Sequence, residues 1–211
     1  MNCAVVAGFL AALFLASWQT ALPTPQPTHS LPLPNTERIE SGLGQSPDGN
    51  AVPYRIRLLP LSSFPDLPPL IAADLNRRQC MIPQSFEAKQ PENVIHGAFH
   101  APGSRDWALL CSAGGVTTLY VFFAGEFEVP IALRSQPDTT WLGAEPGSAI
   151  FGSSWGIAVR SSAELRATPQ LRHAAVIDHD AIDDARLERS LVIHYYQAGK
   201  WLNLNHSDGS D

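Results

Sequence analysis

The sequence is poor in charged residues and contains no block of basic ones. Charged side chains make up 16% of the 211 residues, and the formal net charge is −6. Domains that bind nucleic acid normally carry a positively charged patch. The composition therefore argues against nucleic acid as a partner. The 45% share of apolar residues also excludes an intrinsically disordered chain.

The chain also has no apolar run long enough to cross a membrane. Its most apolar stretch runs from Cys3 to Trp18, about 16 residues, whereas a transmembrane helix needs about 20. Residues 1–21 contain no charged side chain, and the length of the run is typical of a secretory signal. We expect residues 1–21 to be a signal peptide that sends the protein to the periplasm or the extracellular space. An uncleaved anchor is the alternative.

Prolines are concentrated at the amino-terminal end, where 11 of the 18 lie within the first 69 residues. Residues 22–52 alternate prolines with polar residues and then become rich in glycine. Proline removes backbone donors and fixes φ, which favours an extended, solvated chain. We predict a disordered proline-rich linker over residues 22–52 and a single globular domain over residues 53–211.

Cysteine is scarce, with three residues in the chain. Removal of the signal peptide takes Cys3 away and leaves Cys80 and Cys111. An even pair in an exported protein indicates a disulfide. Two buried free thiols are the alternative.

The pattern of apolar residues favours strands over helices. We expect strands over residues 54–59, 94–100, 107–112, 117–123, 131–133, 149–151, 156–160, 190–196 and 201–205. The strands 107–112 and 117–123 are apolar on both faces, so we expect them to be covered on both sides. Since no strand–helix–strand repeat is visible, the predicted fold class is α+β, a mainly antiparallel β-sheet in a single domain.

One or two short helices complete the predicted fold. The first runs over residues 67–78, with Asp66 as its amino-terminal cap. A second, shorter helix lies within residues 161–171. The first helix should bury one stripe of apolar side chains. This stripe consists of Leu67, Leu70, Ile71 and Leu75.

An acidic run over residues 178–184, followed by Glu188, is the first candidate site. Hard cations such as calcium take several carboxylate oxygens from one loop. The predicted ligands are Asp178, Asp180, Asp183 and Glu188. Their spacing is not that of an EF-hand. The alternative is a solvated acidic turn that caps a short helix at Asp180 or Asp183. Apart from calcium, the sequence indicates no cofactor.

The pentapeptide Gly152-Ser153-Ser154-Trp155-Gly156 is the second candidate site. It matches the G-x-S-x-G elbow of serine hydrolases, with Ser154 as the nucleophile. Asp178 and either His194 or His206 would complete the triad in the usual order. The elbow needs a helix after the serine, whereas residues 157–160 indicate a strand. A glycine-rich turn with Trp155 packed below it is therefore the preferred interpretation.

Two resemblances to known families are visible. Residues 97–109, GAFHAPGSRDWAL, resemble a single FG-GAP/VCBS-type repeat, which binds calcium through acidic loop residues. Ala98, His100 and Pro102 stand where that repeat has oxygen ligands. The resemblance implies the loop shape without its cation.

The second resemblance covers most of residues 94–208. Three segments resemble a family of exported bacterial proteins of unassigned function: DWALLCS (106–112), DHDAIDDA (178–185) and LVIHYY (191–196) with GKW (199–201). Ala181 stands where that family usually has glycine. The resemblance implies export and a single domain.

Together these observations predict an exported, non-enzymatic binding or interaction domain on a proline-rich tether. A cation would brace residues 178–188, and the partner would lie in the envelope or the extracellular space. The alternatives are a small secreted serine hydrolase that uses Ser154, and a structural or inhibitor protein of the envelope.

Overall fold

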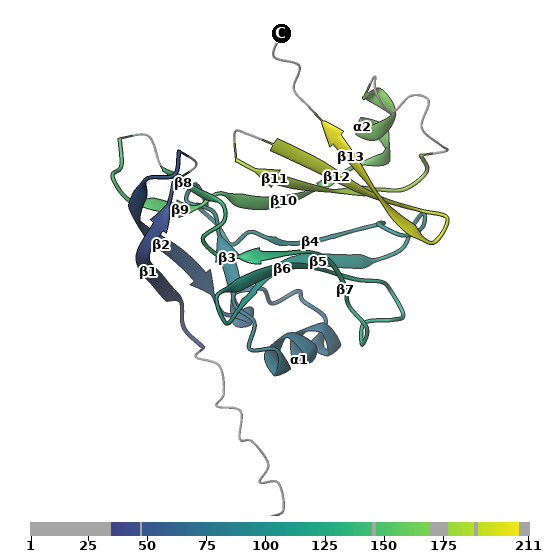
Figure 1. Ribbon diagram of the computed structural model, residues 1–211. Coiled ribbons are helices and arrows are strands. Elements are labelled where there is room, and N and C mark those ends of the chain that lie inside the picture. The colour runs from purple at the N-terminus through teal and green to yellow at the C-terminus, as the bar shows by residue number, and fades with distance from the viewer. Residues whose placement is uncertain (1–34, 47, 145–146, 169–176, 188–189, 207–211) are drawn as a thin grey trace, which may run out of the picture. The chain divides into compact units, whose positions relative to one another are not determined.

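Three β-sheets contain all the strands in the described part of the chain. The computed structural model describes residues 35–46, 48–144, 147–168, 177–187 and 190–206, which all belong to the compact unit 32–211. All strand pairs but one are antiparallel, and two short α-helices accompany them (Figure 1). The fold is α+β and mainly antiparallel β, as predicted.

We name the sheets A, B and C. Sheet A has the order β1-β2-β9-β8, with β3 paired to β2. Its strands are β1 (Arg38–Gln45), β2 (Ala51–Leu59), β3 (Ile82–Gln84), β8 (Leu142–Ala144) and β9 (Phe151–Ser153). Sheet B consists of β4 (Val94–Gly97), β5 (Asp106–Ala113), β6 (Val116–Phe122) and β7 (Ile131–Pro137) in that order. Sheet C consists of β10 (Trp155–Arg160), β11 (Ala181–Arg186), β12 (Ser190–Gln197) and β13 (Lys200–His206) in that order.

Sheet B is covered on both faces, which confirms the prediction for the hairpin β5–β6. One face packs against α1 (Pro69–Arg77) and the other against sheet C (Figure 1). Successive side chains of β5 alternate between these two cores, so Leu109 faces α1 and Leu110 faces sheet C. Each fully buried leucine contributes about 1.5–3 kcal/mol to folding. The core between sheets B and C, which includes Phe99, fixes sheet C relative to the loop that follows β4.

The predicted disulfide is present. Cys80 follows α1, Cys111 lies on β5, and their Cα atoms are 5.3 Å apart. Both residues are buried in the core between α1 and sheet B. The bond therefore ties the carboxyl end of the α1 segment to the central strand of sheet B.

The first helix begins two residues later than predicted. Pro68 is its amino-terminal cap residue and Pro69 its first residue, so Asp66 does not cap it. A residue that precedes proline is pushed out of the helical region, which excludes both Leu67 and Pro68 from the helix. Ile71 and Leu75 are buried as predicted, but Leu70 is 57% exposed because it lies off their shared face.

The predicted disordered linker is wrong over residues 38–45 and 51–52, which form strands. There β1 pairs with β2 along its whole length, from Arg38 opposite Leu58 to Gln45 opposite Ala51. Two glycines of β1 let other side chains approach its backbone closely. A Cβ atom at Gly44 would lie 2.6 Å from Leu142, and one at Gly42 would lie 3.2 Å from the Tyr54 ring. The predicted signal peptide and the linker residues 22–34 lie outside the described residues.

The last hairpin, β12–β13, forms as predicted and borders the site described below. Gln197 pairs with Lys200, which leaves a two-residue turn. Both turn residues, Ala198 and Gly199, have positive φ (49° and 78°). This is the pattern of a type I′ turn, whose twist matches that of the flanking strands.

Candidate ligand-binding site

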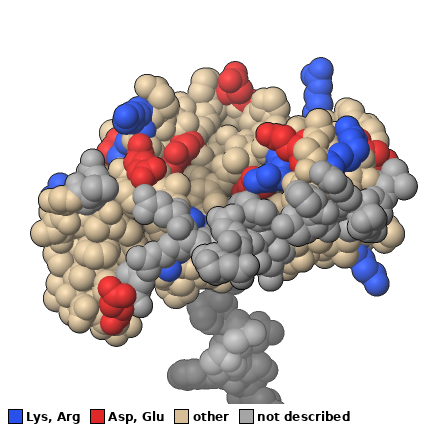
Figure 2. Space-filling model, turned by 90° about the horizontal axis from the view of Figure 1, so that it is seen from above, with Lys and Arg blue, Asp and Glu red and all other residues tan. Residues whose placement is uncertain are grey.

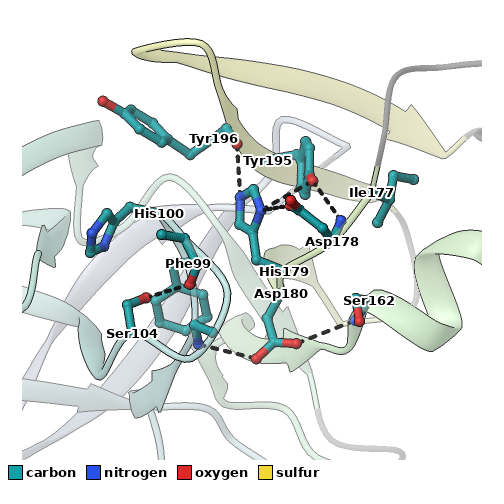
Figure 3. A network of polar contacts seen from close by, with 12 residues as sticks. Phe99, His100, Ser104, Ser162, Ile177, Asp178, His179, Asp180, Tyr195 and Tyr196 are labelled. Carbon is teal, nitrogen blue, oxygen red and sulfur yellow. Dashed lines mark hydrogen bonds and ion pairs between the residues drawn. The ribbon is translucent and has the colours of Figure 1, made fainter.

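The loop after β4 and the segment that enters β11 are joined by backbone hydrogen bonds. Asp180 N–H donates to the Ala98 carbonyl at 2.9 Å, and Ala98 N–H donates to Asp180 Oδ2 at 3.1 Å. Asp180 Oδ1 also accepts from the backbone N–H of Ser162 at 3.3 Å. Figure 3 shows Asp180 below His179, between Ser162 and the loop of His100. One carboxylate thus connects sheet B to the entry of sheet C.

Asp106 organises the loop of residues 98–104 from inside. Its Oδ2 accepts from the backbone N–H groups of Phe99 (2.8 Å) and His100 (2.9 Å) and from Ser104 Oγ (2.6 Å). Its Oδ1 accepts from Ala124 N–H at 2.8 Å. The residue is fully buried, and a buried carboxylate is tolerated only when such donors surround it. The loop conformation therefore depends on Asp106.

The same carboxylate orients the ring of His100. His100 Nδ1 lies 2.8 Å from Asp106 Oδ1, and because a carboxylate only accepts, Nδ1 carries a proton. The neutral ring then presents the lone pair of Nε2, to which no described residue donates. The ring packs against Phe123 at 4.6 Å between centroids, and the side chain is 29% exposed. His100 is therefore a fixed, solvent-accessible acceptor.

His179 is held by the opposite wall, formed by sheet C. Its Nε2 lies 2.8 Å from the Tyr196 carbonyl, which only accepts, so Nε2 carries a proton. Its ring stacks on Tyr195 with 4.5 Å between centroids. The residue is buried, and Figure 3 shows its ring between Tyr196 and Asp178. These contacts fix the position of the ring.

The remaining nitrogen of His179 faces two partners. Asp178 Oδ1 lies 2.7 Å from Nδ1, and the Tyr195 hydroxyl lies 3.2 Å from it. Burial raises the pKa of Tyr195, so its hydroxyl keeps its proton and can donate. The 2.7 Å contact holds the His179 ring against the Asp178 side chain, which is 52% exposed.

These groups surround one open depression of about 370 Å³. This volume lies near the lower end of the range for small-molecule sites. The lining residues are His100, Ala101, Pro102, Asp178, His179, Tyr195, Tyr196, Gln197, Ala198 and Gly199. Asp178 is the sole carboxylate among them, and none is Lys or Arg. We call this hollow the histidine depression.

An aromatic cluster supports the wall of the histidine depression. Tyr196 meets Phe123 edge-on at 5.0 Å and Trp201 edge-on at 5.3 Å, while Phe123 and Trp201 stack at 6.0 Å. Aromatic pairs in such geometries stabilise each other beyond their buried area. The Tyr196 ring is therefore a rigid, partly exposed surface beside the two histidines.

The predicted calcium ligands are not gathered in one place. Asp178 contacts His179, Asp180 joins the loop of residue 98, and Asp183 forms an ion pair with Arg160 at 2.7 Å. Among the described residues, no group of three or more His, Cys, Asp or Glu side chains is arranged to hold a metal ion. Glu188 lies outside the described residues. The structure therefore does not support a calcium site built from the three described acids.

The acidic run does not form the predicted turn that caps a helix. Residues 181–186 form β11, an inner strand of sheet C. Ile182 and Asp184 point toward sheet B, whereas Asp183 points to the other face, where it meets Arg160. The strand was not predicted because two consecutive acidic residues, 183 and 184, interrupt the alternation of apolar and polar residues that is typical of a strand.

Ser154 has no catalytic partner among the described residues. It lies between β9 and β10, is 2% exposed, and donates from Oγ to the Trp141 carbonyl at 2.9 Å. His194 instead contacts Asp184 and Asn203. The side chain of His206 is outside the described part. Because a strand rather than a helix follows Ser154, the elbow of a serine hydrolase is absent.

The first glycine of that pentapeptide has a packing role. A Cβ atom at Gly152 would lie 2.7 Å from the Phe86 Cβ, so the position needs a residue without a side chain. The first glycine of the match is therefore explained by its close packing against Phe86.

Sequence reasoning missed the polar network around Asp184. Its Oδ1 accepts from Trp155 Nε1 at 2.6 Å, and its Oδ2 lies 2.9 Å from His194 Nε2 and 3.2 Å from Arg134 Nε. Asp184 is 1% exposed. The signal that could have revealed it was the alternation of Ile182 and Asp184 on one strand face. Sequence reasoning also missed Tyr195 and Tyr196, because nothing local relates β12 to the loop after β4.

Comparison of the chain with protein-family models, with curated proteins and with solved structures found no match. None of the helices in the described part of the chain is long and apolar enough to span a membrane. The argument for function therefore depends on the geometry of the histidine depression.

Proposed function

We propose that the protein is an exported binding domain that takes a small ligand in the histidine depression. One observation carries this proposal. His100 and His179, which lie on different walls of the same hollow, are each fixed by a carboxylate. Side chains that are already immobile lose little entropy when a ligand binds. Such a site is suited to recognition.

The disulfide and the amino-terminal sequence support export. Disulfides persist in oxidising compartments, and Cys80 and Cys111 form one. Residues 1–21 have the apolar, uncharged composition of a secretory signal, and prolines follow it. We propose that residues 22–34 act as a proline-rich tether at the amino-terminal end of the folded domain.

The polar groups favour binding over hydrolysis by Ser154. That hydroxyl is buried and engaged with a backbone carbonyl, and neither His194 nor Asp178 contacts it. On the face shown in Figure 2, the described acidic and basic side chains are interspersed. The described side chains of this face form no extended patch of one sign that would attract a charged macromolecule, which favours a small ligand.

A screen by thermal unfolding tests the proposal. The full chain, purified after export, is heated with a panel of sugars, amines, carboxylates and phosphate esters. A ligand of the histidine depression should raise the midpoint of the wild-type protein but not that of His100→Ala, because a ligand stabilises the state it binds. His96→Ala is the matched control, since His96 is exposed on β4 and does not line the hollow.

Two results would overturn the proposal. One is a panel in which no compound changes the midpoint. The other is a compound that stabilises the wild-type, His100→Ala and His96→Ala proteins equally, since its site would then lie elsewhere.

A further inference from the structure

We infer that the ligand of the histidine depression is a neutral sugar, an inference that rests on the proposed function. Three properties of the hollow lead to it: its charge, its hydrogen-bonding groups and its aromatic wall.

The charge of the lining disfavours ionic ligands. None of the described residues that line the hollow is Lys or Arg, so these residues do not supply the donors that normally bind phosphate or carboxylate groups. The one carboxylate among them, Asp178, lies 2.7 Å from His179 Nδ1, so the described lining offers no second carboxylate for a cation. A neutral ligand therefore fits the charges of the described lining best.

The polar atoms match the hydroxyl groups of a sugar, each of which can donate and accept. His100 Nε2 is an acceptor because Asp106 holds the ring proton on Nδ1. Asp178 Oδ2 is a second acceptor, which receives no hydrogen bond from the described residues while Oδ1 faces His179. The Tyr196 hydroxyl can donate, and no described residue bonds to it. Both acceptors are oriented by contacts made on their other atom.

The aromatic wall matches the C–H face of a sugar ring. Tyr196 is braced edge-on by Phe123 and Trp201, so its ring is already ordered. Figure 3 shows the rings of Tyr196 and His100 on the same side of His179. A rigid aromatic side chain supplies contact area at a small cost in conformational entropy. Apolar contact with Tyr196 and hydrogen bonds to His100 and Asp178 are thus available together.

Isothermal titration with neutral disaccharides tests the inference. The probes are maltose, cellobiose and N,N′-diacetylchitobiose, added to the full chain purified after export. We expect at least one to bind, and His100→Ala and Tyr196→Ala to weaken that binding at least about tenfold. Tyr196→Phe keeps the ring and should lose much less affinity than Tyr196→Ala. His96→Ala should bind like the wild type.

The outcomes separate this inference from the proposed function. If no disaccharide binds but an amine or an anion does so in a His100-dependent way, the sugar is wrong and the binding site stands. If a disaccharide binds equally well to the wild-type, His100→Ala and Tyr196→Ala proteins, both ideas fail. Should Tyr196→Ala not fold, as judged by tryptophan fluorescence, His100→Ala alone decides: unchanged affinity overturns the inference.

Discussion

Asp106 and Asp184 are buried acids whose oxygens are surrounded by donors. Asp106 accepts hydrogen bonds from the backbone of one loop. Asp184 contacts side chains from both sheet B and sheet C. Removing a carboxylate from such a place leaves its donors buried without an acceptor, which costs more than the hydrogen bonds themselves contribute. Individual residues of this kind determine the geometry of the histidine depression.

Asp106→Ala should lower the free energy of unfolding by about 3 kcal/mol, because the N–H groups of Phe99, His100 and Ala124 lose their acceptor. Urea denaturation followed by tryptophan fluorescence measures this loss. The control is Asp48→Ala, at an exposed position outside this loop. A loss no larger than that of the control would contradict the role given to Asp106.

Tyr195 should make the protein less stable at alkaline pH. Burial raises its pKa above the ordinary value of 10.0. The folded state thus favours the neutral phenol, and this contribution is complete below the unfolded pKa and is lost as the pH rises through the folded pKa. Tyr195→Phe should flatten the decline in unfolding free energy as the pH rises above about 10. Tyr54→Phe, on β2, is the comparison, and an equal decline in both variants would refute the assignment.

At the scale of elements, prolines and glycines determine where regular structure begins and turns. Pro68 and Pro69 delay α1, and Ala198 and Gly199 close the hairpin β12–β13. The second helix, α2 (Ser162–Ala167), begins with a complete capping box between Ser161 and Glu164. The disulfide then fixes α1 to sheet B, which has a measurable consequence.

Replacing both cysteines by alanine should lower the unfolding free energy by about 3–4 kcal/mol. The bond joins Cys80 and Cys111, which are 31 positions apart in the sequence. Its loss raises the conformational entropy of the unfolded chain and so favours unfolding. Guanidinium denaturation of the Cys80→Ala/Cys111→Ala protein measures the effect. Reduction of the wild-type protein with dithiothreitol serves as the control and should produce a similar loss. If reduction leaves the midpoint unchanged, the disulfide is not a source of stability.

At the scale of the whole domain, sheets B and C are joined by an apolar core with one ionic contact inside it. Arg134 on β7 reaches Asp184 on β11 at 3.2 Å, and it also lies over the Trp141 ring at 5.0 Å. The apolar residues of this core include Leu110 and Ile182. The ion pair between Arg134 and Asp184 therefore fixes the position of β7 in sheet B relative to β11 in sheet C.

Asp184→Ala should lower the unfolding free energy by about 3–5 kcal/mol, because it leaves the buried Trp155 and His194 without their acceptor and the half-buried Arg134 without its anion. Asp183→Ala is the matched control, one residue away on the opposite face of β11. It breaks a more exposed pair with Arg160 and should cost about half as much or less. Chemical denaturation of both variants measures the difference. Equal losses would show that Asp184 has no special part in joining the sheets.

Most strands and both hairpins of sheets B and C were predictable, because alternation and turn glycines act within a few residues. The Cys80–Cys111 bond was also predictable, from the even cysteine count. The strand β1 was not, since its glycines and exposed Leu43 carry no apolar alternation. Its formation depends on pairing with β2 and on the approach of Tyr54 and Leu142.

The sequence by itself determined the α+β class, most of the strands and the disulfide, because each follows from local pattern or from residue count. Only the tertiary structure decided that His100 and His179 share one hollow. The hydrogen bond from Ala98 to Asp180 joins residues 82 apart, and it forms because the apolar core between sheets B and C fixes where sheet C lies. Contacts between residues so far apart in the sequence depend on tertiary packing, and no local sequence pattern predicts them.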